Sequence, residues 1–265
     1  MTTTVVTTVA PAKPVDATAP ARPSPGLAER RPPTARLVGL EIRKSLSTRS
    51  GRTLALTAAL LPAIGIGIAM ALGQKPPSAP EMLGVLGTLV ATLMLSVGVL
   101  ATAGEWTHKT VQTTFLAVPR RHRVLIAKYG GMALLGAAIS ALVAASTLAV
   151  AAVLAGSAFS WAGVGIAVAA TIGTGAAMTA IGAGVGAAVA NVPAALTGSY
   201  VVLLIGMNLL RATKPVWALH VDPLQAMADL ISRQGSAGTH IAVLAGWVAV
   251  ATLAGAALTR RRALA

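Results

Sequence analysis

The chain has 265 residues, of which 55% are hydrophobic, 11% charged and 3% aromatic. Its charges fall between long uncharged stretches, a distribution that excludes an ordinary soluble domain. The formal net charge is +14, but the basic residues flank the apolar stretches, as in membrane proteins, so we expect no nucleic-acid partner. Cysteine is absent, which excludes disulfides and thiolate metal sites.

Residues 1–34 are rich in Thr, Ala and Pro and lack apolar periodicity, which predicts a disordered cytoplasmic tail. Residues 35–50 predict an interfacial elbow helix, with Thr34 as its N-cap. Apolar residues recur on one face of that helix: Val38, Ile42 and Leu46. Because other apolar residues share a side with charged ones, an ordinary basic flank before the first span is an equal alternative.

Residues 51–262 predict an all-α, six-transmembrane helix bundle, because a span needs about twenty apolar residues. The spans are expected at about 53–73, 82–103, 129–156, 161–190, 193–210 and 239–259. The uncharged stretch from Trp161 to Leu210 is too long for one crossing, and Pro193 favours a break between two helices there. A five-span or re-entrant arrangement is the alternative, since the turn at Asn191 carries no basic residue.

The basic residues predict the orientation. Those outside the cytoplasm would be Lys75, Arg211, Lys214 and Arg233, while the other Lys and Arg residues fall in the tail, in the loop at 104–128 and at the C-terminus. This asymmetry predicts a multi-pass protein of the plasma (cell inner) membrane with cytoplasmic N- and C-termini.

The proposed spans contain no Asp, Glu, Lys or Arg and no mid-span His, which argues against an ion-coupled carrier. The nearest lookalike to a phosphate loop, GEWTHKT at 104–110, lacks the glycine before Lys109. Ser140 and Ser146 have no visible base, so an intramembrane enzyme is disfavoured. We therefore expect no enzymatic activity and no cofactor on this chain, with chemical energy supplied by another subunit.

The fourth span is nearly all Ala and Gly, and Gly182 and Gly186 form a GxxxG pair that lets helices pack closely. Such pairs also arise by chance in a chain rich in Ala and Gly. The stretch as a whole favours a buried, packed helix.

The segment 104–128 is the most informative stretch. Glu105 and Lys109 stand i, i+4, and apolar residues recur at helical spacing through Phe115 until Pro119, which predicts a short cytoplasmic helix. A basic cluster follows, able to bind lipid phosphates or an acidic groove on a partner: Arg120, Arg121, Arg123 and Lys128. A plain positive-inside loop is the alternative.

With these motifs in place, the chain resembles the membrane subunit, or permease, of a type-2 ABC transporter of the actinobacterial type. The resemblance rests on a basic helix before six spans and on the pattern of the loop, followed by matches in the fourth and fifth spans. The matching loop residues are Gly104, Glu105, Trp106, Thr110, Thr113, Thr114, Pro119, Arg120, Arg121 and Lys128, and the later ones are Gly186, Asn191, Pro193 and Asn208 to Leu210. Met207 departs from the pattern, because an acidic residue often stands before that Asn.

The resemblance implies an exporter in which two permeases, identical or paralogous, pair with two ABC ATPase subunits that bind ATP and Mg. The segment 104–128 would then be a coupling helix that docks on the ATPase. Its docking residues would be Gly104, Glu105, Trp106, Lys109, Phe115, Pro119, Arg120 and Arg121. A non-transporting membrane scaffold or immunity protein is the alternative, and it should tolerate loss of that helix.

Overall fold

The computed structural model describes residues 33–74, 78–108, 121–154, 156–157 and 159–262, except for the side chains of Arg121 and His122. The predicted tail at 1–34 lies almost wholly outside these residues. All elements below belong to the compact unit that begins at Pro33.

Six helices in the described residues are long and apolar enough to cross a membrane, which confirms the predicted number of spans. Five are continuous: α2 (Arg49–Ala71), α3 (Ala79–Thr107), α5 (Arg121–Leu154), α6 (Val164–Val189) and α11 (Ala237–Arg262). The fifth span in chain order consists of α7 (Val192–Tyr200), the π-helix η1 (Val201–Gly206) and α8 (Met207–Thr213). The chain is therefore a multi-pass, all-α membrane protein.

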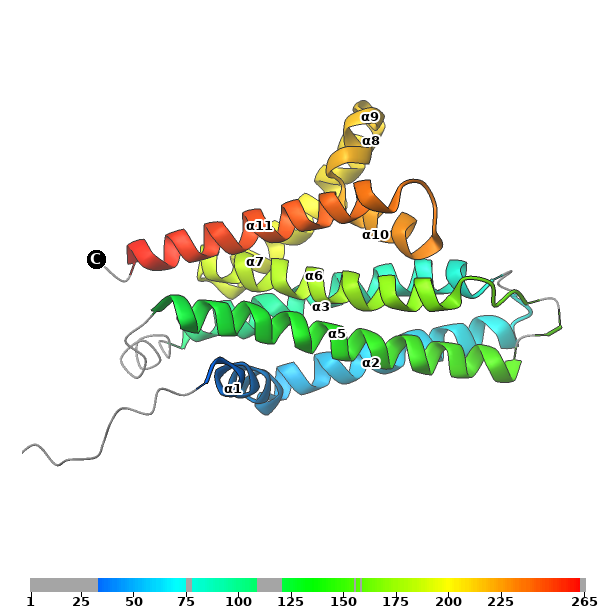
Figure 1. Cartoon of the computed structure of the whole chain (residues 1–265), viewed down its shortest axis with the longest axis horizontal. Helices are drawn as coiled ribbons and strands as arrows, with labels where there is room; N and C mark the ends of the chain where they lie inside the picture. The colour runs from blue at the N-terminus through cyan, green and yellow to red at the C-terminus, as the bar shows by residue number, and fades with distance from the viewer. Residues whose placement is uncertain (1–32, 75–77, 109–120, 155, 158, 263–265) are drawn as a thin grey trace, which may run out of the picture. The chain divides into compact units, whose positions relative to one another are not determined.

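The first helix, α1 (Thr34–Ser47), precedes the spans and lies across the ends of α2 and α5 (Figure 1). The prediction of Thr34 as its N-cap is wrong, because Thr34 is the first helical residue and Pro33 occupies the cap without a side-chain hydrogen bond. Thr48 separates α1 from α2, and its hydroxyl accepts a hydrogen bond from the backbone N–H of Gly51 at 3.1 Å. This cap fixes the elbow between the two helices.

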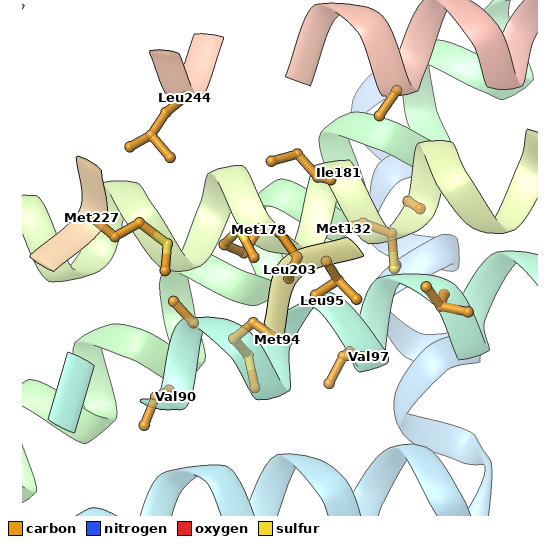
Figure 2. Close-up of a cluster of buried hydrophobic side chains, with 14 of the residues drawn as sticks. Val90, Met94, Leu95, Val97, Met132, Met178, Ile181, Leu203, Met227 and Leu244 are labelled. Carbon is orange, nitrogen blue, oxygen red and sulfur yellow. The ribbon is translucent and has the colours of Figure 1, made fainter. Parts of the chain in front are cut away.

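The core lies between α3 and α6, with α5 and α11 packed on the other sides of α6 (Figure 1). Figure 2 shows Met94 and Leu95 of α3 beside Met178 of α6, with Leu203 of the fifth span reaching the same cluster. Met side chains fill irregular gaps well, which suits helices brought close by glycines.

The break between the fourth and fifth spans falls where the sequence predicts it. The helix α6 ends at Val189, Ala190 adopts a left-handed conformation (φ 59°), and α7 begins at Val192 with a proline in its first turn. The side chain of Asn191 accepts a hydrogen bond from the N–H of Ala194 at 3.0 Å. An N-cap and a proline at the start together stop one helix and open the next.

The fifth span is the least enclosed. Only 11% of its most apolar window is buried against the rest of the described chain, compared with 61% for α3. One side-chain contact that holds it is a hydroxyl pair, Ser96 Oγ to Tyr200 Oη at 2.6 Å, directly before the π-helix. Its other face is therefore left to lipid or to a partner.

Residues 211–238, which lie between the expected fifth and sixth spans, contain two further helices: α9 (Pro215–Val221) and α10 (Pro223–Ser232). Asp222 separates them and caps α10, because its carboxylate accepts from the N–H groups of Leu224 and Gln225 at 2.9 and 3.3 Å. In Figure 1, α8 and α9 project away from the long helices, whereas α10 packs against α3.

Candidate functional site

Four charged side chains from three helices meet at one end of the bundle. Lys128 of α5 lies between two carboxylates, with its Nζ at 2.7 Å from both Glu41 Oε2 of α1 and Glu105 Oε1 of α3. Lys44 of α1 also pairs with Glu105. We call Glu41, Lys44, Glu105 and Lys128 the charged node.

The node is buried except at Lys44. The side chains of Lys128, Glu105 and Glu41 are 6%, 7% and 12% exposed, whereas that of Lys44 is 42% exposed. The two acids and two bases give the node a formal charge of zero. Pairing of opposite charges in this way offsets the cost of removing them from water. Because each ion's burial depends on its partners, the node ties α1, α3 and α5 together.

Local packing explains why α1 reaches the node. Gly131 lies one turn beyond Lys128 on α5, and a Cβ built on it would stand 3.2 Å from the Cβ of Glu41 and 3.3 Å from the carbonyl oxygen of Val38. A larger residue would therefore push α1 away from α5. The close approach at Gly131 places Glu41 within reach of Lys128.

The node borders the segment 104–128 on both sides. Glu105 precedes the part of this segment that lies outside the described residues, and Lys128 follows it. Their ion pair therefore closes the segment at its base. The described structure places Gly104, Glu105 and Trp106 in the last turn of α3, so they extend the second span rather than begin a separate helix.

Other contacts bring α6 and α11 to the same end. The guanidinium of Arg262 donates to the backbone carbonyls of Ala187 and Ala188 and lies 5.5 Å from the ring centroid of Trp106. Trp106 thus contacts the last turn of α11. The described start of α1, the end of α11, the α6–α7 junction and the base of the segment 104–128 share one end of the bundle.

Not all predicted coupling residues are described. Four fall outside the described residues: Lys109, Phe115, Pro119 and Arg120. Arg121 is the first residue of α5, and its side chain is likewise outside the description. The coupling helix itself remains a prediction.

The two glycines singled out for packing face α3. A Cβ on Gly182 would stand 2.0 Å from the carbonyl oxygen of Leu95, and one on Gly186 would stand 2.9 Å from that of Val99. Gly98 approaches from α3, where a Cβ would stand 2.1 Å from the carbonyl oxygen of Thr179. These distances leave no room for a side chain, so glycine sets the spacing of the two helices.

Sequence reasoning missed the pairing within the node and a second ion pair, of which only the carboxylate is buried. Asp222, fully buried at the start of α10, lies 2.8 Å from the Nε of Arg211 in α8. One signal was available for it: Asp followed by Pro223 is the pattern of an N-cap and a first helical residue. No local pattern in the sequence indicated that Arg211 would be the partner of Asp222.

The site's chemistry is electrostatic. In the part of the chain that the structure describes, no group of three or more His, Asp or Glu residues could hold a metal ion. The node's bases are engaged by carboxylates, and its acids by ammonium groups. What this arrangement can do is transmit a displacement of one helix end to the other two.

No protein-family model matches the chain, and no curated protein matches it.

Proposed function

We propose that this chain is the permease subunit of an ATP-driven ABC exporter in the plasma membrane, with the charged node as the point where the segment 104–128 acts on the spans. The observation that carries the proposal is the node itself. A buried ion network joins both ends of that segment to α1 at the end of a six-span apolar bundle.

Burial makes the node a stiff connection. Separating one ion from its partners in a poorly solvated place costs several kcal/mol, on the order of 3–5, so the three helix ends move together when one is displaced. A force applied to the segment 104–128 would reach α3 and α5 through its two ends and α1 through Glu41 and Lys44. Such a connection suits a subunit that receives its energy from outside.

The basic residues support the orientation within this proposal. Exposed basic residues gather at the node's end on α1, at the α1–α2 elbow and on the last turn of α11, which would place that end and both termini in the cytoplasm. An ATPase docked there would meet the segment 104–128. A second permease copy would pair with the first in the membrane.

The test combines docking with activity. The chain is co-expressed with the ABC ATPase encoded nearest to its gene, and recovery of the ATPase on the purified chain is measured together with ATP hydrolysis in proteoliposomes. Arg120→Glu with Arg121→Glu should abolish both recovery and stimulated hydrolysis, because these bases are predicted to face the partner.

The matched control is Arg260→Glu with Arg261→Glu, two exposed bases at the same end of the bundle that the proposal does not place in contact with the ATPase. Both double variants should insert and fold alike. If no ATPase is recovered with the unaltered chain, or if the Arg120 and Arg121 variant retains full stimulation, the exporter proposal is wrong. The alternative of a membrane scaffold or immunity protein would then be favoured.

A further inference from the structure

A groove lies beside the charged node, between the α1–α2 elbow, the last turns of α3 and the first residue of α7. Its volume is about 550 Å³. We call it the elbow groove. It is open at Gly104, where a built Cβ would meet nothing within 4 Å among the described atoms. This volume lies within the range of sites that bind small ligands.

The lining of the elbow groove changes from apolar to polar along α3. Val97, Leu100 and Ala101 of α3 line the groove together with Leu46 and Leu135. Toward the end of α3 the lining becomes polar, with Thr107 and His108, and the α1–α2 elbow adds Lys44, Thr48 and Ser50. Val97 and His108 are eleven residues apart, which is about 16 Å along a helix.

This gradient follows the membrane. Val97 lies within the apolar helix α3, which is long enough to span a membrane, whereas His108 is the residue that caps its end. A ligand that fills the groove must therefore be apolar at its deep end and polar at the surface. A membrane phospholipid has that form and is present at high concentration at this depth, whereas a soluble phosphate ester would leave the apolar wall unfilled.

The charge at the mouth of the groove indicates which lipid headgroup would bind there. The side chain of Lys44 is 42% exposed. Its ammonium group has three hydrogen-bond donors and pairs with Glu105, so it can also bind a phosphate. Arg43, Arg49 and Arg52 are exposed on the adjoining turns of α1 and α2. Glu105 also lines the groove, but Lys44 and Lys128 pair with it. Because the charged node is formally neutral, the net positive charge near the mouth comes from Arg43, Arg49 and Arg52, which adjoin the groove without lining it.

We infer that the elbow groove binds one anionic phospholipid, with an acyl chain along Val97, Leu100 and Ala101 and the phosphate at Lys44. A lipid seated there would contact α1, α2, α3 and α7 at once. It would thus stabilise the node's end of the bundle, independently of any ATPase.

The test measures lipid binding to the purified full-length chain by native mass spectrometry and by the thermal midpoint of unfolding in detergent. Phosphatidylglycerol should bind with a stoichiometry of one and raise the midpoint. Phosphatidylcholine with the same acyl chains should bind about tenfold more weakly, and inorganic phosphate and glycerol phosphate should give no shift. Equal effects of the two lipids, or protection by phosphate alone, would overturn the inference.

Two variants and one control variant locate the site. Ala101→Phe fills the groove and should remove the tight phosphatidylglycerol site, whereas Ala138→Phe, on the exposed face of α5, should bind as the unaltered chain does. Lys44→Gln should reduce the preference for phosphatidylglycerol about tenfold, as expected for one lost charged contact.

Unchanged binding by Ala101→Phe and by Lys44→Gln would overturn the inference, as would a groove that takes up no lipid because another part of the chain fills it. If Ala101→Phe fails to fold, Lys44→Gln and the comparison of the two lipids decide the question.

Discussion

Replacing Lys128 by methionine tests the charged node most directly. Methionine keeps much of the side-chain volume but removes the ammonium group that lies 2.7 Å from both Glu41 and Glu105. Two buried carboxylates would then share Lys44, so the node would carry a formal charge of minus one. Removing one member of a buried ion network costs about 3–5 kcal/mol, so we expect the free energy of unfolding to fall by that amount.

Lys44→Met is the matched comparison. Its side chain is 42% exposed, and Lys128 would still hold both acids, so the loss should be about 1 kcal/mol or less. Unfolding is followed by circular dichroism in mixed micelles with rising sodium dodecyl sulfate. A Lys128→Met variant no less stable than Lys44→Met would refute the assignment of Lys128 as the buried centre.

A triple variant that also removes the two buried carboxylates controls for packing lost at Lys128. When Glu41→Gln and Glu105→Gln are added to Lys128→Met, the node has no buried carboxylate left to be unpaired, and most of the lost stability should return. If the triple variant is as unstable as Lys128→Met alone, the loss comes from packing around Lys128 and the electrostatic reasoning fails.

Three further predictions concern the helix contacts. Gly182→Ala should lower the free energy of unfolding by about 1–3 kcal/mol, because its Cβ would overlap the backbone of α3. Gly173→Ala on the same helix has open space around it and should be neutral or stabilising by about 0.5–1 kcal/mol. Thermal unfolding of both variants tests this difference. Asp222→Ala should lower stability by about 1 kcal/mol more than Asp222→Asn, which keeps an oxygen to cap α10, and equal losses in thermal unfolding would exclude the capping role. Tyr200→Phe removes the hydroxyl pair with Ser96 and should cost about 0.6 kcal/mol and speed hydrogen exchange in η1, a change that would be absent if the pair did not hold the fifth span.

The spans were predictable because their signal is local. A run of about twenty uncharged residues reports a transmembrane helix by itself, and the proline after Asn191 reports a break in the same way. The helix ends were less predictable. The helix that contains the third span already includes Arg121, ahead of the expected span start at Tyr129, because a helix can continue beyond the hydrocarbon into water.

The candidate site was predicted as a segment and not as a set of contacts. Glu41 and Lys128 are 87 positions apart, and their pairing depends on the close approach of α1 and α5 at Gly131. No periodicity within either helix encodes that approach. Likewise, the apolar pattern could not predict the π-helix after Tyr200, since Val, Leu and Ile are compatible with either an α-helix or a π-helix.

The π-helix also sets the register of the fifth span. A π turn holds one residue more than an α turn, and one residue corresponds to about 100° of rotation. Everything after Gly206 is therefore turned by about that angle relative to an uninterrupted α-helix. Arg211 meets Asp222 at this register, so the extra residue in η1 fixes which face of α8 is tied to α10. Loss of a single residue between Val201 and Gly206 would leave the span apolar and nearly as long, yet would turn Arg211 away from its partner.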